Sequence, residues 1–504
     1  MAQHKFQDMA FTPSVYQQGI YDFITKGKGN AVVSAVAGSG KTTTLLNALK
    51  LIPTNKTVLF LAFNKSIAKE LSEKVPNTPN IHVKTVHGFG FSSLKDYNKD
   101  IFAQKYIKIL NDVFEFLHTE NMNIISSYKF STDDMKSVYQ MEVNFEEEKI
   151  ERQGYLRRVV QLCDLGRMNL IDTENCDTGV EQLTEIATKH NVELQNGECF
   201  RAWHLIKLGT SYFAKMDFTD MIYLPIKFNV KVRQYDYVFI DECQDLNACQ
   251  RTLMLSAIKP KIGRFVAVGD PAQAIYGFAG ADAFSFTKLT ELPNTVKLPL
   301  SVCYRCGKNI IAEAQKIISH IEAFDGAKDG AVEHDKELSH IQDGDMVLCR
   351  QTYPLVRLCL LFLSQGKKAR IMGGDIGASL VKNIQDTKRK REEWTLENMF
   401  NRLYADLDKV LQSIMRKEKL SVEDAKETKT YDMAKEKISV IEMLATDCDS
   451  PEDICNKIKN IFSDDTKGGI LLSTIHKSKG LEADRVFIIH SELMPSKLQN
   501  KIGK

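Results

Sequence analysis

The most constraining feature of this 504-residue chain is a glycine-rich segment at residues 35–42, Ala-Val-Ala-Gly-Ser-Gly-Lys-Thr. A short apolar run precedes it at residues 31–34, and a helical pattern follows it at residues 43–49. In a strand–loop–helix unit of this kind, backbone N–H groups and the N-terminus of the helix surround phosphate oxygens. The segment therefore predicts a phosphate-binding loop at the edge of a parallel sheet, with ATP or a close analogue as ligand.

The side chains of this loop have separate expected roles. Lys41 would reach the β- and γ-phosphates, and Thr42 would place its hydroxyl on Mg²⁺. The usual first glycine of the pattern is replaced by Ala35. The residues expected to contact the nucleotide here are Ala37, Gly38, Ser39, Gly40, Lys41, Thr42 and Thr43.

A pair of carboxylates follows another apolar run, at residues 237–240, about two hundred residues later. The carboxyl ends of parallel strands meet at one edge of a sheet, so Asp241 and Glu242 would face the phosphate loop. Asp241 would hold the magnesium ion, and Glu242 would orient and deprotonate the attacking water. Acidic residues after a strand are also common as solvated strand ends. Their order after Lys41 and Thr42 favours the catalytic interpretation.

Short apolar runs bounded by Gly, Asp or Asn predict buried parallel strands in two separate regions. The first set lies at residues 31–34, 57–61, 81–85, 237–240 and 265–268, and the second at residues 345–349, 369–372, 469–473 and 485–489. Helical, charge-rich segments interrupt each set, at residues 91–214 and 386–463. The pattern predicts two α/β domains with parallel sheets, each carrying a helical insertion.

Composition restricts the class of protein further. A hydrophobic content of 43% with 26% charged residues is typical of a globular chain. The net charge of +2 means that any nucleic-acid surface would be a local groove. Eleven scattered cysteines indicate reduced thiols, and no stretch approaches the roughly 18 apolar residues of a membrane span. We expect a soluble cytoplasmic protein, or a nuclear one in a eukaryote.

One Cys-x-x-Cys pair occurs, Cys303 and Cys306. No second pair of cysteines or histidines lies at zinc spacing from it. We interpret the pair as two thiols beside a functional arginine rather than as a metal site.

Further segments occur in a fixed order along most of the chain. They are Phe63-Asn64-Lys65, residues 85–89 (Thr-Val-His-Gly-Phe), 217–221 (Asp-Phe-Thr-Asp-Met), 241–245 (Asp-Glu-Cys-Gln-Asp), 268–281 (starting Val-Gly-Asp-Pro-Ala-Gln), Tyr304-Arg305 and 474–482 (Thr-Ile-His-Lys-Ser-Lys-Gly-Leu-Glu). With the phosphate loop, they make the chain resemble a superfamily 1 DNA helicase of the UvrD/Rep type.

The resemblance implies two RecA-like P-loop NTPase domains, each with a helical insertion. The implied bounds are 1–92 and 215–283 for the first domain, 93–214 for its insertion, 284–385 and 464–504 for an apparently incomplete second domain, and 386–463 for the second insertion.

For the nucleotide site, the resemblance implies roles for six residues outside the loop and the carboxylate pair. Gln17 would read the adenine edge, although its neighbour Gln18 leaves the register open. Gln273 would sense the γ-phosphate, and Arg305 would act as an arginine finger from the second domain. Tyr304 would stack on the adenine, and Lys479 and Glu482 would approach the phosphates and the sugar.

For DNA, the resemblance implies contacts on both domains. Aromatic side chains stack on any base, which suits a motor that ignores sequence; the candidates are Phe63, Tyr276 and Phe278. Phe63 ends an apolar strand, so a core position is the alternative. The other groove-lining candidates are Asn64, Lys65, Thr85, His87, Thr474 and His476. The basic run at 388–391 is interpreted as a solvated helix start or linker, with a duplex contact as the alternative.

Two features depart from the family pattern. Ala279 stands where relatives usually carry an arginine, and the sequence stops at Lys504, before a segment that supplies relatives with a second arginine finger. The expected activity is ATP hydrolysis stimulated by single-stranded DNA, driving 3′-to-5′ movement and unwinding at duplex junctions. The alternative is a catalytically weak helicase-like subunit, or a truncated helicase, needing a separately encoded C-terminal or replication and repair partner.

Overall fold

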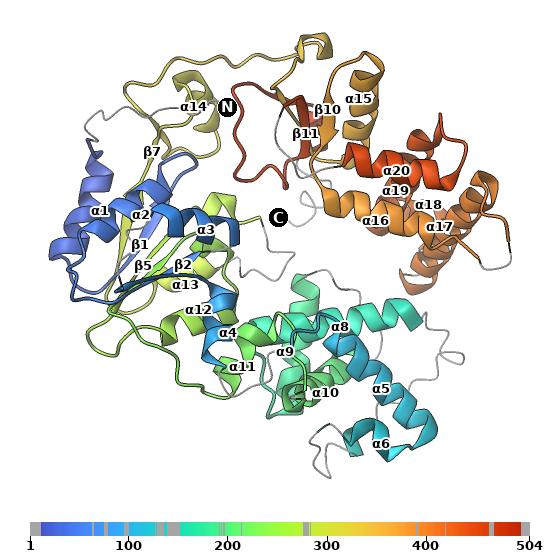
Figure 1. The fold of residues 1–504 in the computed structure, drawn as a ribbon, viewed down its shortest axis with the longest axis horizontal. Coiled ribbons are helices and arrows are strands. Elements are labelled where there is room, and N and C mark those ends of the chain that lie inside the picture. Colours follow the sequence, from blue (N-terminus) through green and yellow to red (C-terminus); the bar gives the residue numbers. More distant parts are fainter. Residues whose placement is uncertain are drawn as a thin grey trace. The chain divides into compact units, whose positions relative to one another are not determined.

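The computed structural model describes residues 12–62, 65–74, 79–94, 100–126, 128, 136–138, 152–190, 192, 194, 197–212, 214–275, 282, 284–389, 392–418, 420–462 and 468–494 (Figure 1). The chain forms two compact units, Met1–Val332 and Glu333–Lys504. Each unit is built on a parallel sheet. In the described residues, no helix is both long and apolar enough to cross a membrane.

The first unit contains a parallel sheet with the strand order β3-β2-β4-β5-β1-β6. Apolar residues alternate between its two faces, as the two-residue period of a strand requires. In β1, Ala31 and Val33 pack in one core, whereas Val32 packs in the other. The strands are β1 (Asn30–Ala35), β2 (Val58–Ala62), β3 (Ile81–Thr85), β4 (Tyr237–Ile240), β5 (Arg264–Gly269) and β6 (Thr295–Leu300).

Helices cover both faces of this sheet, which is the doubly wound arrangement. On one face lie α1 (Val15–Lys26), α2 (Lys41–Lys50) and α3 (Lys65–Lys74). On the other lie α4 (Val86–Ser93), α11 (Asp220–Lys227), α12 (Ala248–Ser256) and α13 (Ser285–Thr290). A two-stranded sheet of β7 (Val302–Cys303) and β8 (Glu322–Ala323), with α14 (Lys308–Ala314), follows β6.

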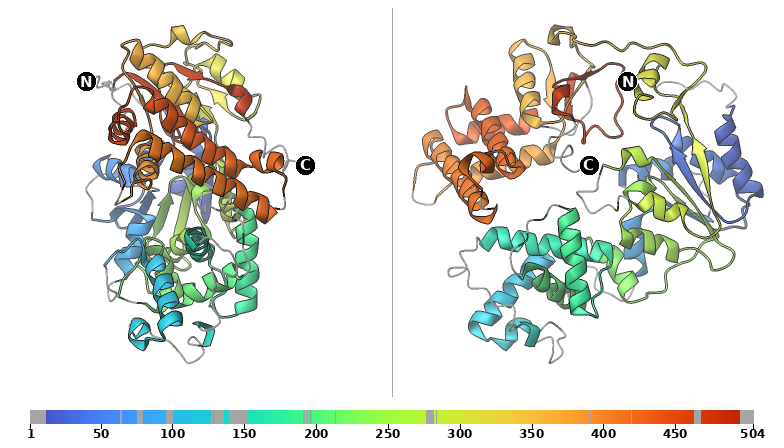
Figure 2. Two further views of the ribbon diagram at one scale, coloured as in Figure 1. Left: turned by 90° about the vertical axis from the view of Figure 1, so that its right-hand side faces the viewer. Right: turned by 180° about the vertical axis from the view of Figure 1, so that it is seen from behind.

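A group of helices separates β3 from β4 in the sequence and gathers beyond α4 and α11 (Figures 1 and 2). It contains α5 (Lys105–Thr119), α6 (Met122–Ile125), α8 (Arg152–Asn169), α9 (Cys176–Lys189) and α10 (Glu198–Ser211). Their apolar faces join the core under the sheet.

A buried ion network ties these helices to the chain that leads into α11. The fully buried guanidinium of Arg167 donates to both carboxylate oxygens of Asp217, at 2.8 and 2.7 Å, and to Asp220 at 2.7 Å. Asp220 also accepts from Lys105 at 2.6 Å, and the guanidinium lies 4.0 Å from the centre of the Tyr106 ring. Burial opposes charge on Arg167, but the two carboxylates raise its pKa well above the usual value.

The second unit contains a parallel sheet with the order β10-β11-β9-β12. Its strands are β9 (Met346–Cys349), β10 (Ala369–Ile371), β11 (Ile470–Thr474) and β12 (Val486–Ile488). Its helices are α15 (Thr352–Ser364), α16 (Gly374–Gln385), α17 (Leu396–Glu418), α18 (Val422–Lys426), α19 (Lys429–Ala445) and α20 (Pro451–Ile461). Most of the helices share one apolar core with the sheet, whereas α18 and the C-terminal half of α17 form a separate small cluster.

The predicted fold class, α/β with parallel sheets and many helices, is confirmed. Three strands were not predicted: β6, β7 and β8. β6 pairs in parallel with β1 and belongs to the first sheet, although the sequence-based bounds end the first domain at residue 283. β6 lies at the sheet edge, has several exposed residues and contains Pro299, so it lacks the continuous apolar run of the other strands.

Candidate functional site

The phosphate loop connects β1 to α2 and has the geometry of an anion site. Gly38 and Gly40 have φ angles of 68° and 75°, which favour glycine. No side chain caps the N-terminus of α2, and the first N–H groups of a helix have no acceptor within it. The Ser39 hydroxyl is buried with no hydrogen-bond partner in the described structure. These donors suit the phosphate groups of a nucleotide.

The lysine of the loop is paired with the second carboxylate after β4. Lys41 Nζ lies 2.9 Å from Glu242 Oε1, and both side chains are largely buried. Burial alone would lower the pKa of Lys41, but Glu242, Asp241 and Asp270 outweigh it and raise the pKa. Lys41 is therefore a fixed positive charge at the mouth of the loop. Glu242 itself has a φ of 54°, an unusual backbone conformation for a side-chain-bearing residue.

Asp241 is a buried carboxyl at the end of β4, 4% exposed. Burial and the neighbouring Glu242 raise its pKa to about 6, against an opposing effect of Lys41. A carboxyl in such surroundings is suited to a cation, and Mg²⁺ prefers oxygen ligands while keeping several waters. Asp241 and the Thr42 hydroxyl fit that chemistry. No cluster of three or more His, Cys, Asp or Glu ligands occurs in the described part of the chain.

Gln244, to which the sequence interpretation gave no role, connects the two halves of the site. Its Nε2 donates to Glu242 Oε2 at 2.6 Å, and its Oε1 accepts from the backbone N–H of Asp270 at 3.0 Å. Gln273 Nε2 donates in turn to Asp270 Oδ2 at 2.8 Å. A hydrogen-bonded path therefore runs from Lys41 through Glu242 to Gln273. The missed signal was the position of Gln244, two residues after Glu242 on a tight turn.

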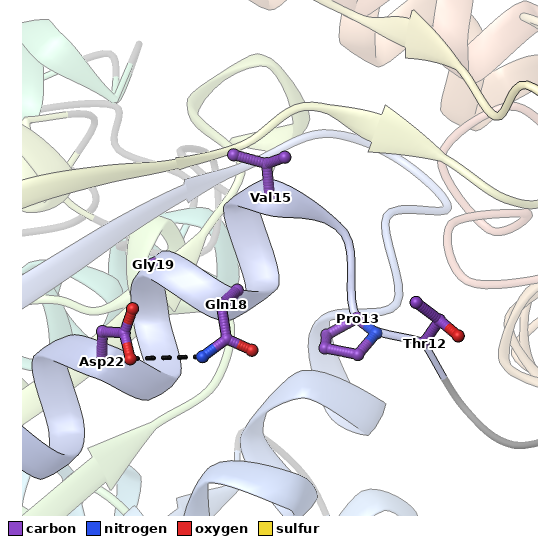
Figure 3. A pocket seen from close by; sticks show the side chains of 6 residues that line it. All are labelled: Thr12, Pro13, Val15, Gln18, Gly19 and Asp22. Carbon is purple, nitrogen blue, oxygen red and sulfur yellow. Dashed lines mark hydrogen bonds between the residues drawn. The ribbon is translucent and has the colours of Figure 1, made fainter.

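Gln17, rather than Gln18, faces the loop. Its Nε2 donates to Thr44 Oγ1 at 3.0 Å, and its Oε1 accepts from Ser14 N as part of a helix-capping pair. Gln18 instead donates to Asp22 at 3.2 Å on the exposed side of α1. There it lines a shallow hollow with Thr12, Pro13, Val15, Gly19 and Asp22 (Figure 3). Adenine recognition by Gln17 remains a prediction.

The segment after β7 lies directly against the phosphate loop. Tyr304 donates its backbone N–H to the Gly38 carbonyl at 2.9 Å. A Cβ placed on Gly38 would lie 2.7 Å from Arg305 Cβ and 2.8 Å from Cys303 Sγ, so this position needs glycine. The Tyr304 hydroxyl points to Gln17 Oε1, 3.5 Å away. The sequence interpretation assigned Arg305 to the second α/β domain, whereas its contacts group it with the first unit.

The candidate DNA-contacting residues are described only in part. Phe63, Asn64, Tyr276 and Phe278 lie outside the described residues, and Lys65 is described only as the first residue of α3. Thr85 caps α4 by accepting from Gly88 N at 3.0 Å. Burial lowers the pKa of His87, which favours a neutral ring at pH 7. Their contact with DNA remains a prediction.

The candidates in the second unit follow β11. Thr474 ends that strand and accepts from Lys477 N at 3.4 Å. His476, Lys479 and Glu482 lie in the turns beyond it. Their approach to nucleotide or DNA remains a prediction. In the basic run, Lys388 lies 4.8 Å from the centre of the Trp394 ring and 3.8 Å from Glu452, so it has partners within its own unit. A contact of this run with duplex DNA remains a prediction. Residues 390 and 391 lie outside the described residues.

A glycine-rich loop between a strand and a helix, with a lysine paired to a carboxylate that follows another strand of the same sheet, defines a P-loop NTPase. Residues 18–294, more than half of the chain, match the family model of the UvrD/REP helicase N-terminal domain. The chain belongs to this family.

Curated relatives carry related names. The chain is similar to the F-box DNA helicase protein 1 of Schizosaccharomyces pombe, with 24% identity over 90% of this chain and 50% of that protein. It is similar to the probable DNA helicase II homolog of Mycoplasma genitalium, with 27% identity over 60% of this chain and 42% of that protein. The ATP-dependent DNA helicase Rep of Buchnera aphidicola shares 23% identity over 58% and 41% respectively. The chain spans about half the length of the curated relatives it matches.

Proposed function

We propose that this chain hydrolyses ATP with Mg²⁺ in response to single-stranded DNA, and that hydrolysis drives 3′-to-5′ movement along the strand and unwinding of duplex junctions. The observation that carries the proposal is the hydrogen-bonded path from Lys41 through Glu242, Gln244 and Asp270 to Gln273. Such a path can make the state of the phosphate loop depend on the segment after β5. The names of the relatives give the substrate class.

Hydrolysis follows from exchanges among buried charges. When nucleotide enters, Lys41 turns from Glu242 to the β- and γ-phosphates, which frees Glu242 to accept the proton of the attacking water. Asp241 and Thr42 would hold a magnesium ion, which neutralises charge developing on the phosphates. Arg305 would add positive charge as the γ-phosphoryl group departs, and the close approach of its Cβ to Gly38 supports this role.

Coupling to DNA depends on Gln273. This side chain is held by Asp270, and residues 276–281 begin three positions after it in the sequence. A change at the γ-phosphate would reach the candidate stacking residues Tyr276 and Phe278 over a few residues of chain. Phosphate contacts carry no sequence information, so the DNA backbone is the natural track for repeated steps.

The decisive experiment measures ATP hydrolysis by residues 1–504 with and without single-stranded DNA, beside Lys41→Ala. We expect DNA to stimulate turnover several-fold and the variant to lose it while still binding single strands. Full turnover in the variant would show that the site is assigned wrongly. DNA binding without turnover in the natural chain would overturn the motor and leave a nucleotide- and DNA-binding subunit. Unwinding of 3′-tailed against 5′-tailed duplexes checks the direction.

A further inference from the structure

Two thiols enclose Tyr304 and Arg305. Cys303, at the end of β7, is 1% exposed, whereas Cys306 is partly exposed. The Cys306 side chain packs against the small apolar cluster that contains Cys303, and hydrogen bonding from Cys306 and from the backbone of Arg305 acts on the Cys303 thiol. The pair is thus already arranged side chain to side chain, with one member open to small reagents.

Cys303 differs from other cysteines of the chain. The hydrogen bond from Cys306 lowers its pKa to about 6 against the effect of burial, with further help from the two backbone N–H groups and the charge of Arg305. Burial instead raises the pKa of the thiols at positions 163, 176, 199, 243, 249, 349, 359, 448 and 455. Thiol reactivity depends on the thiolate, so Cys303 is chemically distinct.

The same pair is packed against the phosphate loop. Cys303 Sγ would lie 2.8 Å from a Cβ on Gly38, and Val36 of the loop shares a small apolar cluster with Cys303, Cys306 and Ile311. Tyr304 lies between the two cysteines in the sequence and donates its backbone N–H to the Gly38 carbonyl. A change in the distance between the sulfurs therefore acts on the wall of the nucleotide site.

We propose that Cys303 and Cys306 form a redox-active dithiol, which small-molecule disulfides convert to an intramolecular disulfide that slows ATP turnover at the adjoining phosphate loop. The effect on turnover rests on the proposed function; the formation of the disulfide does not.

The step balances as two thiol–disulfide exchanges. The Cys306 thiol loses its proton as it attacks the reagent, forms a mixed disulfide and releases one small thiol, which takes up that proton. The Cys303 thiolate then attacks the Cys306 sulfur and displaces the second small thiol. Both protein sulfurs are oxidised and the reagent disulfide is reduced to two thiols; the first takes the proton of Cys306, and the second takes its proton from solvent.

The product would reshape the segment that carries Arg305. A disulfide holds its sulfurs at about 2.05 Å with a fixed dihedral angle, closer than two hydrogen-bonded sulfurs. Tyr304 and Arg305 would lie inside the ring that the disulfide closes, so their backbone must change conformation. Because Tyr304 is hydrogen-bonded to Gly38, that change would also move the phosphate loop.

The test uses the full chain, oxidised glutathione and dithiothreitol. We expect oxidised glutathione to lower DNA-stimulated turnover several-fold, to remove two hydrogen masses from the peptide that holds both cysteines, and to be reversed by dithiothreitol. Cys306→Ser should keep the turnover of the reduced chain and resist inhibition. Cys176→Ser, at another partly exposed cysteine, is the matched control and should remain sensitive.

Two results would overturn the proposal: a peptide that keeps both thiols free, or equal inhibition of the natural chain and Cys306→Ser. If the reduced chain hydrolyses no ATP, the proposed motor fails on its own. The dithiol is then decided by the peptide mass and by affinity for a fluorescent ATP analogue, which oxidation should weaken in the natural chain and leave unchanged in Cys306→Ser. An unchanged affinity in both would contradict it.

Discussion

Gln244 shows how one neutral side chain can organise a charged site. It is 2% exposed and uses its amide in both directions, donating to Glu242 and Asp245 and accepting from the backbone of Asp270. The close approach also explains Gly269, where a Cβ would lie 2.5 Å from Gln244 Oε1. We regard Gln244 as a positioning residue, because its contacts orient Glu242 and not the substrate.

Gln244→Leu should therefore lower kcat for ATP far more than it changes KM. Leaving buried partners unsatisfied costs about 1–3 kcal/mol, which corresponds to roughly fivefold to 150-fold in rate. DNA stimulation should fall as well, because the path to Gln273 is cut. Steady-state hydrolysis with and without single-stranded DNA measures both, with the exposed Gln18→Leu as control. A change confined to KM would contradict the positioning role.

At the residue scale, the sequence predicts which residues form the site better than it predicts which side chains they contact. The motif spacing indicated that Lys41, Asp241 and Glu242 would meet at one sheet edge, and the structure brings Lys41 to Glu242. It could not indicate that Gln244 turns back to bridge Glu242 and Asp270, since that depends on the left-handed backbone at Glu242. Nor could it place Cys303 against Gly38, because their contact joins segments far apart in the sequence.

At the element scale, burial explains which strands could be predicted. β2 and β5 are almost wholly buried, so each is a continuous apolar run that identifies it without an alignment. β6 has one buried residue at its end and exposed positions before it. An edge strand needs apolar residues only where it is covered, so its sequence carries a weaker signal. The boundary predicted from the sequence, residue 283, therefore lies before β6, which belongs to the first sheet.

We expect Arg167 to contribute to the attachment of the helices between β3 and β4, because it joins α8 to Asp217 and Asp220. Arg167→Met would remove the guanidinium that Asp217 and Asp220 share and, among the described ion pairs, leave Asp220 only Lys105, and breaking a buried ion pair from one side typically costs about 3–5 kcal/mol. We expect the midpoint of urea unfolding to fall, as followed by circular dichroism. Arg157→Met, at an exposed position of the same helix, is the matched control. Equal stability of the two variants would show that packing alone attaches these helices.

At the scale of the whole molecule, the chain is two units with separate apolar cores. The described groups of the phosphate site lie in the first unit, including Lys41, Asp241, Glu242 and Arg305. The family resemblance adds Lys479 and Glu482 from the second unit. Lys479 and Glu482 lie in the second unit, so their binding of the nucleotide has to be tested by experiment.

Thermal unfolding with a non-hydrolysable ATP analogue and Mg²⁺ can test them. Units with separate cores are expected to unfold in separate transitions, and a ligand at a hundred times its Kd stabilises the unit that binds it by about 2.7 kcal/mol. We expect calorimetry to show both transitions rising in the natural chain, and only the first rising in a Lys479→Ala, Glu482→Ala double variant. If the analogue leaves the temperature of the second transition unchanged in the natural chain, Lys479 and Glu482 do not bind the nucleotide. The site would then be confined to the first unit.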